Sequence, residues 1–100
     1  PHVEVQGLLP QKLITPRYPF NALQKGVEGK VKVVFDVLEN GAVSSPRIIE
    51  EYPEGVFGKS VMEALKRSTF APALMDGKKI TMRDVVETYV FKIDTAEARQ

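Results

Sequence analysis

The sequence predicts a small two-layer α+β domain, in which a three-stranded antiparallel sheet carries one main amphipathic helix and one short N-terminal helix on a single face. Three observations support this fold class: an Asn-Gly pair between two apolar stretches, a later stretch with helical spacing, and a long final stretch rich in β-branched and aromatic residues. One hundred residues suffice for one domain with a modest core.

The two ends of the chain are predicted to lie outside this domain. Residues 1–15 carry Pro, Gln and Gly among scattered apolar residues, which predicts an extended linker end with one strand-like piece at residues 3–9. The domain itself is assigned to residues 16–93, and residues 94–100 are assigned to a polar tail. Because the first residue is Pro1 and not Met, we expect the chain to be a piece of a longer protein.

A short helix is predicted at residues 20–25, directly after two prolines. Pro16 and Pro19 hold the preceding stretch extended, since the residue before a proline is disfavoured in the helical region. Pro19 can open the helix without losing a hydrogen bond, and Gly26 is a natural stop.

A β-hairpin is predicted next, from residues 30–38 and 42–50. Its first strand alternates, with the apolar residues Val31, Val33, Phe35 and Val37 on one face. Asn40-Gly41 is a strong hairpin signal because a type I′ turn needs positive φ at both central residues. Pro46 cannot donate to a ladder, so the return strand is expected at the sheet edge with a bulge near Ser45.

The main helix is predicted at residues 56–69, followed by a surface loop at residues 75–79. The helical spacing is carried by Phe57, Val61, Ala64, Leu65 and Ser68, with charged residues between them. The final stretch, residues 82–93, contains neither Gly nor Pro and reads as a strand with apolar side chains on both faces. Such a strand in a small sheet exposes an unpaired edge, which is the requirement for binding by strand addition.

The sequence offers no set of residues suited to catalysis. There is no cysteine, the single His2 has no metal-ligand spacing around it, and Gly26 and Gly29 are too sparse for a phosphate loop. No serine has a nearby histidine, so a nucleophilic site has no support. We therefore expect no enzyme activity, no metal and no cofactor.

Nucleic-acid binding is a second function class to which the sequence can be compared. Basic side chains and the aromatics Phe35, Tyr89 and Phe91 could in principle form a surface that stacks bases. A net charge of +1 is too weak to argue for it, and these aromatics share faces with aliphatic residues, as core residues do. We therefore expect no nucleic-acid partner.

Several short motifs, in order, carry a family resemblance across residues 15–93. They are Tyr18-Pro19, Glu28-Gly29-Lys30-Val31, Phe35-Asp36-Val37, Asn40-Gly41-Ala42-Val43, Ile48, Phe57, Ala64-Leu65, Phe70-Ala71-Pro72 and Tyr89-Val90-Phe91-Lys92-Ile93. In this order and spacing they resemble the C-terminal domain of the TonB family. The resemblance departs at Thr15, where the family usually has Gln, and at Ser68-Thr69, where the best-known members have Trp-Arg. These departures are consistent with a divergent, second-type TonB.

The resemblance implies a periplasmic domain of an energy transducer, anchored to the inner membrane by an N-terminal helix that this fragment lacks. It implies ExbB and ExbD as partners through the missing part. It also implies binding to TonB-dependent outer-membrane receptors for iron-siderophore complexes, haem or cobalamin. The same edge could form a strand-exchanged homodimer in the isolated domain. The alternative with the same fold is a TolA-like or cell-wall-binding periplasmic module.

The resemblance also assigns two partner-binding segments. A short box of the receptor is expected to add as a strand beside Val85, Val86, Glu87, Thr88, Tyr89, Val90, Phe91, Lys92 and Ile93. The receptor plug is expected to lie near Thr15, Pro16, Arg17, Tyr18 and Pro19.

Overall fold

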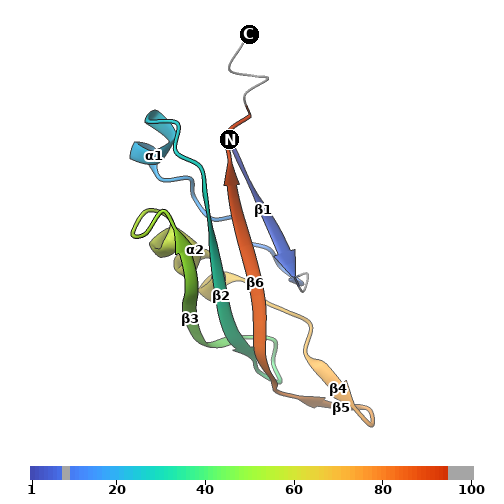
Figure 1. Ribbon diagram of the computed structural model, residues 1–100. Coiled ribbons are helices and arrows are strands. Elements are labelled where there is room, and N and C mark those ends of the chain that lie inside the picture. Colours follow the sequence, from blue (N-terminus) through green and yellow to red (C-terminus); the bar gives the residue numbers. More distant parts are fainter. Residues whose placement is uncertain (8–9, 95–100) are drawn as a thin grey trace.

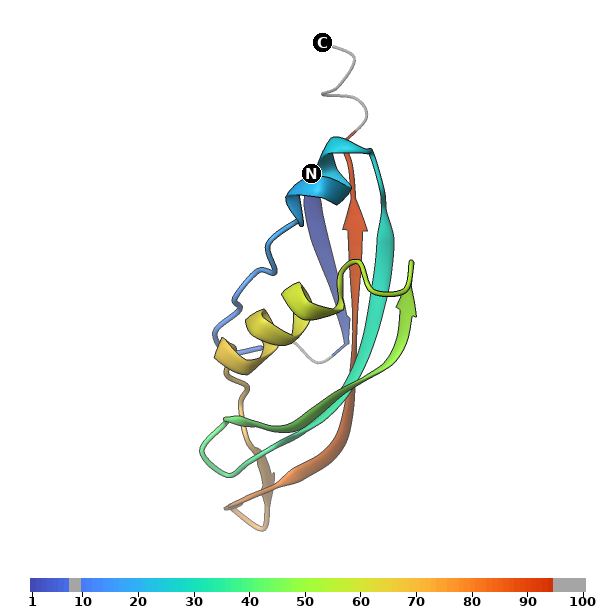
Figure 2. The ribbon, with the colours of Figure 1, turned by 90° about the vertical axis from the view of Figure 1, so that its left-hand side faces the viewer.

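The computed structural model describes residues 1–7 and 10–94, and it shows a four-stranded antiparallel sheet with both helices on one face (Figures 1 and 2). The elements in chain order are β1 (His2–Gly7), α1 (Phe20–Gln24), β2 (Gly29–Val37), β3 (Val43–Tyr52), α2 (Gly58–Arg67), β4 (Ala73–Met75), β5 (Lys78–Ile80) and β6 (Met82–Lys92). The strand order of the main sheet is β1-β6-β2-β3. Among the described residues, no helix is long and apolar enough to cross a membrane.

The α+β fold class is confirmed, but the prediction of three strands in the sheet is wrong. The additional strand is β1, which pairs with the outer side of β6. The sequence assigns this stretch to the linker end, because it shows only a strand-like piece at residues 3–9 there. Its alternating Val3 and Val5 pack against the core, and this contact fixes it as a strand. Leu8 and Leu9, the end of that predicted piece, lie outside the described residues.

The core lies between the sheet and α2, as the alternation of β2 predicts. Val31, Val33, Phe35 and Val37 are fully buried against the helix layer. From α2 the buried side chains are Val61, Ala64 and Leu65, and Phe57 and Phe70 close the two ends of the helix. The predicted core faces of both elements are therefore confirmed.

The β2–β3 hairpin forms where the sequence predicts it, with a different turn. Only Gly41 has positive φ there (84°), and its N–H donates to the carbonyl of Leu38 at 2.8 Å. The connection is therefore a longer loop with one left-handed glycine, not a two-residue type I′ turn. The Asn40 side chain takes part by accepting a hydrogen bond from the N–H of Ala42. The predicted bulge on the edge strand is confirmed, because Ser45 has φ 51° and the β2–β3 register shifts beside it.

A second two-stranded ribbon, β4–β5, replaces the predicted surface loop at residues 75–79. Asp76 and Gly77 have φ 51° and 78° and form the two-residue turn between Met75 and Lys78. Asp-Gly is itself a strong hairpin signal, and the short flanking strands hid it. The ribbon projects from the end of the sheet opposite to the chain termini (Figure 1).

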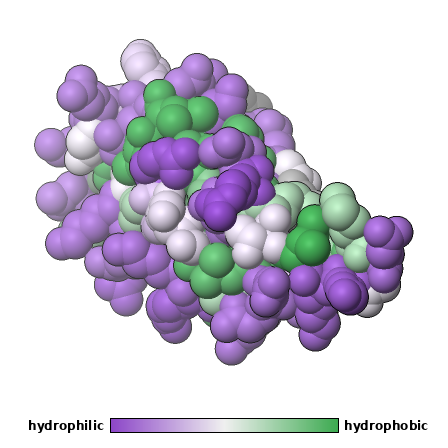
Figure 3. Space-filling view, turned by 90° about the horizontal axis from the view of Figure 1, so that it is seen from below, coloured by the Kyte–Doolittle hydropathy of each residue, from purple (hydrophilic) through white to green (hydrophobic). Residues whose placement is uncertain are grey.

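The ribbon carries exposed apolar side chains at Leu74 and Met75. Viewed from below, toward this end of the molecule, the apolar groups on the surface are separated by hydrophilic residues (Figure 3). This face therefore shows no single large apolar patch of the kind that marks a stable protein interface.

Candidate partner-docking site

The strand assigned to partner docking, β6, is a central strand of the main sheet. It pairs with β2 from Gly29↔Phe91 to Val37↔Met82 on one side. Its side chains alternate: Val85, Glu87, Tyr89 and Phe91 face the helix layer and are buried. Burial, followed by the charge of Glu87, raises the pKa of Tyr89 to about 12, so this phenol stays neutral at any physiological pH.

The other edge of β6 is occupied by β1, which corrects the expectation of a free edge. The register runs from His2↔Lys92 to Gly7↔Glu87. Of the nine residues assigned to receptor-box docking, Glu87 to Lys92 therefore have a strand partner already, whereas Val85, Val86 and Ile93 lie beyond the paired stretch. The physical reason is the one that suggested docking: a long strand with an open edge pairs with any suitable segment, and the chain supplies one itself.

Buried side chains contribute little to the attachment of β1 to β6. None of its residues is fully buried, and Val3 and Val5 are the apolar side chains that pack against the core. At Gly7 the chain approaches β6 closely, since a Cβ there would lie 2.7 Å from the carbonyl oxygen of Val86. Pairing of β1 with β6 therefore depends largely on backbone hydrogen bonds.

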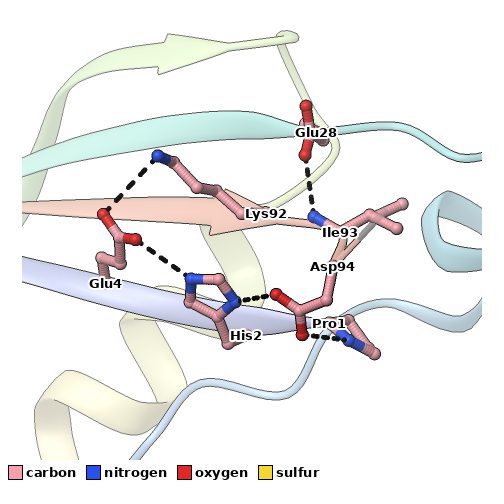
Figure 4. Close-up of polar contacts among 7 residues, drawn as sticks. All are labelled: Pro1, His2, Glu4, Glu28, Lys92, Ile93 and Asp94. Atoms are coloured by element: carbon pink, nitrogen blue, oxygen red, sulfur yellow. Dashed lines mark hydrogen bonds and ion pairs between the residues drawn. The ribbon is translucent and has the colours of Figure 1, made fainter. Parts of the chain in front are cut away.

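A cluster of charged side chains lies at the end of the β1–β6 pair where β1 begins and β6 ends (Figure 4). His2 lies between two carboxylates: its Nδ1 is 2.5 Å from Asp94 Oδ1 and its Nε2 is 3.0 Å from Glu4 Oε2. Lys92, directly across from His2, reaches Glu4 at 3.8 Å, and the Pro1 ammonium reaches Asp94 at 3.2 Å. On the β2 side, the Ile93 N–H donates to Glu28 Oε2 at 2.8 Å.

This cluster predicts that β1 docks less firmly as the pH rises. The hydrogen bonds to Glu4 and then Asp94 raise the pKa of His2 above its usual 6.5. The stabilising charge is therefore fully present below 6.5 and is lost as the pH rises through the raised pKa. At the acid end, His2 lowers the pKa of Glu4, and the Pro1 ammonium followed by His2 lowers that of Asp94, so their contribution is lost only below the usual carboxyl range.

Hydrogen-exchange protection factors of the β1 amides measure this effect. We expect them to fall as the pH rises above 6.5 in the wild-type chain, by a small amount because solvent reaches all three side chains and screens their charges. The matched control is His2→Gln, in which the pH dependence should become smaller. Equal pH profiles for the two proteins would contradict the prediction.

The second predicted segment, Thr15 to Pro19, crosses the helix side of the molecule. Tyr18 anchors it: the ring makes edge contacts with Phe57 and Phe91 at centroid distances of 5.5 Å each, and its hydroxyl donates to the carbonyl of Val27. Tyr18 therefore links the lead-in segment to the core. Pro16 is buried and Tyr18 and Pro19 are half-buried, whereas Thr15 and Arg17 are exposed.

The ring contact between Tyr18 and Phe91 brings the two predicted segments together at the core. Both docking segments therefore rest on one aromatic cluster, which comprises Tyr18, Phe57 and Phe91 and includes a stacked Phe57–Phe91 pair at 4.2 Å.

Comparison with known proteins assigns the family. Residues 14–93 match the family described as Gram-negative bacterial TonB protein C-terminal. The chain belongs to this family. Protein TonB of Yersinia enterocolitica is 40% identical over 78% of the chain, and Protein TonB of Pseudomonas aeruginosa is 32% identical over 85%. The chain spans 28% and 25% of the lengths of these two relatives.

Solved structures of the TonB family share this fold. The solution NMR structure of the Pseudomonas aeruginosa TonB CTD aligns with a TM-score of 0.68 and 28% identity, covering 92% of this chain and 87% of that one. The TonB2 protein from Vibrio anguillarum aligns with a TM-score of 0.69 and 33% identity, covering 88% and 83%. The predicted membership of the TonB C-terminal domain family is confirmed.

Several residues that shape the site were missed from the sequence. Glu51 accepts a hydrogen bond from the N–H of Gly58, the first residue of α2, at 2.8 Å and so caps this helix. Ser68, at the departure from the family pattern, is buried and accepts from the N–H of Ile14 at 3.2 Å. The Ile14–Ser68 contact joins positions far apart in the chain, and the Glu51–Gly58 contact crosses an irregular turn. Neither contact produces a periodic pattern in the sequence.

Proposed function

We propose that this domain is the periplasmic receptor-binding part of a TonB energy transducer, which is anchored in the inner membrane through a segment outside this fragment. In this proposal it binds TonB-dependent outer-membrane receptors of iron-siderophore complexes, haem or cobalamin by strand addition along β6. ExbB and ExbD act through the missing part. The role is one of binding and force transfer, not of catalysis.

The observation that carries this proposal is the difference between the two edges of β6: β2 is packed firmly against one edge, and β1 is held weakly at the other. On one side, β6 is fixed by its ladder to β2, and four of its side chains are buried. On the other side it holds β1, which has no fully buried residue. A receptor segment that replaces β1 would restore the same backbone hydrogen bonds, and it would remove only the half-buried contacts of Val3 and Val5 from the core.

Strand exchange sets a moderate affinity. Each backbone hydrogen bond contributes roughly 0.5–1.5 kcal/mol net, and the incoming peptide must be ordered. The receptor box also competes with β1, a tethered strand present at high effective concentration. These terms together favour roughly micromolar binding. Tension along the paired strands would load many hydrogen bonds at once, so a complex of moderate affinity can still transmit force.

A titration with a receptor-box peptide, followed by backbone amide shifts of the 100-residue chain, tests the proposal. We expect the largest shifts in β6 and the loss of strand-like shifts in β1 as the peptide replaces it. A scrambled peptide of the same composition is the control. Shifts confined to residues outside β1 and β6 would contradict docking at this edge.

A further inference from the structure

A cleft of about 360 Å³ lies between the segment that leads into Tyr18 and one side of α2. Its lining residues are Ile14, Thr15, Arg17, Ser60, Glu63, Ala64 and Arg67. An adjoining cavity of about 300 Å³ shares Arg17, Ser60 and Glu63 with it and adds Pro19, Val56 and Lys59. Together the two cavities form one groove along α2, which we call the α2 groove.

Hydrogen bonds hold the lead-in segment against α2 at two points. At one end of the groove the N–H of Ile14 donates to Ser68 Oγ, and that hydroxyl donates to the carbonyl of Ala64 at 3.0 Å. At the residues that the two cavities share, the hydroxyl of Ser60 donates to the carbonyl of Arg17. Because both walls are held in place by these bonds, the groove is preformed and costs little to organise on binding.

The α2 groove carries excess positive charge. Arg17 extends from one wall and Arg67 from the other, with Lys59 further along, against the single carboxylate of Glu63. Within the part of the chain that the structure describes, neither arginine has a carboxylate within ion-pair distance. Guanidinium groups bind carboxylates through paired hydrogen bonds, so two of them across one cleft favour an acidic ligand.

We propose that the α2 groove binds an extended acidic peptide segment of the partner protein, with one carboxylate held between Arg17 and Arg67. The groove suits a chain better than a single ion, because the apolar residues Ile14, Ala64 and Val56 line it together with the cations. The inference deepens the proposed function: it rests on a receptor as partner and gives the chemistry of the contact near Thr15 to Pro19.

The test uses the 100-residue chain and a short capped peptide of alternating Asp and Leu, titrated at low salt and followed by amide and arginine side-chain shifts. The matched ligand is the same peptide with Asn in place of Asp. We expect the Asp peptide to shift resonances of Arg17, Arg67 and the intervening α2 residues, and to bind more tightly than the Asn peptide. Equal binding of the two peptides, or shifts elsewhere, would overturn the proposal.

Three variants make the test specific. Arg67→Gln should weaken the Asp peptide by roughly two- to fivefold, the range for partly exposed ion pairs. Glu63→Gln should strengthen it, since it removes the one opposing charge that lines the groove. Lys66→Gln is the control, because Lys66 lies on the same helix without lining the groove and should change the affinity far less. An equal loss in Arg67→Gln and Lys66→Gln would indicate a diffuse charge effect and overturn the proposal.

Two further titrations separate this site from its alternatives. Inorganic phosphate that competes fully with the Asp peptide at equal concentration would indicate a simple anion site and overturn the proposal. A receptor-box peptide titrated in parallel reports on β6 alone. If it fails to bind while the Asp peptide binds in the groove, strand addition is wrong and the groove assignment stands. If the receptor-box peptide binds and the Asp peptide does not, the groove proposal is wrong and strand addition stands.

Discussion

A disulfide between β1 and β6 should abolish binding of the receptor-box peptide, and reduction of that disulfide should restore it. The variant is Gln6→Cys with Thr88→Cys, two residues directly opposite each other in the β1–β6 ladder. Opposite residues of an antiparallel pair have Cα atoms about 4.5–5.5 Å apart, within the range that a disulfide spans. Because the chain has no cysteine of its own, the introduced pair can form only the intended bond within the molecule.

The expected effect is large because the lock removes the binding-competent state itself. Apparent affinity is the intrinsic affinity multiplied by the fraction of molecules in which β6 is open. A covalent bond between the strands reduces that fraction by about 100-fold or more, since it adds several kcal/mol to the cost of separation. Calorimetric titration of the oxidised and reduced forms measures the difference.

The controls come from the same chain. The single variants Gln6→Cys and Thr88→Cys should bind the peptide as the wild type does under reducing conditions. Val5→Ser acts in the opposite direction: it removes a half-buried contact of β1 with the core, so β1 should detach more often and the peptide should bind more tightly. Full affinity in the oxidised double variant would show that the receptor box does not use this edge.

Local patterns in the sequence specified most of the fold. The alternation of Val31 to Val37, the helical spacing from Phe57 to Leu65 and the bulge at Ser45 each follow from a period or from one residue type, so they could be predicted without the structure. The β4–β5 ribbon was missed although Asp76-Gly77 is a strong turn signal. Its strands are three residues each, which is too short for an alternation to show.

The parts of the site that could not be predicted depend on contacts between distant segments. Pairing of β1 with β6 joins residues at opposite ends of the chain, and β1 itself has only Val3 and Val5 as an apolar pattern. The α2 groove needs Ser68 and Ser60 to hold the lead-in segment against α2. The helical spacing places Ser68 on the inner face of the predicted helix, but it gives no sign of the partner that either serine bonds.

Replacing Phe57 by Ala should destabilise the domain by about 3–5 kcal/mol, the usual cost of removing a buried phenylalanine. Phe57 is fully buried, stacks on Phe91 at 4.2 Å and receives the edge of Tyr18 at 5.5 Å. Its ring also lies under Gly29, where a Cβ would come within 2.7 Å of it, so the neighbouring backbone is packed tightly around the site. The resulting cavity therefore has few groups that could move to fill it.

Urea denaturation of the wild type and the variant measures this loss. Tyr18→Phe is the matched control: it keeps the ring contacts and removes only the hydrogen bond to the carbonyl of Val27, so it should cost about 0.5–1.5 kcal/mol. If Phe57→Ala cost no more than Tyr18→Phe, the aromatic cluster would not be the junction that the geometry indicates.

The loss of stability in Phe57→Ala would show what keeps β6 in place while it exchanges β1 for the receptor box. If β6 relied mainly on the β1 ladder, losing β1 would free the strand and the domain would unfold under load. Instead Phe91 is held from behind by Phe57 and Tyr18, and the ladder to β2 continues beside it. We therefore expect Phe57→Ala to lower the free energy of unfolding far more than Val5→Ser, while only Val5→Ser raises the affinity for the receptor-box peptide. A variant pair with this opposite pattern would separate the contacts that hold β6 in place from the contact that covers its edge.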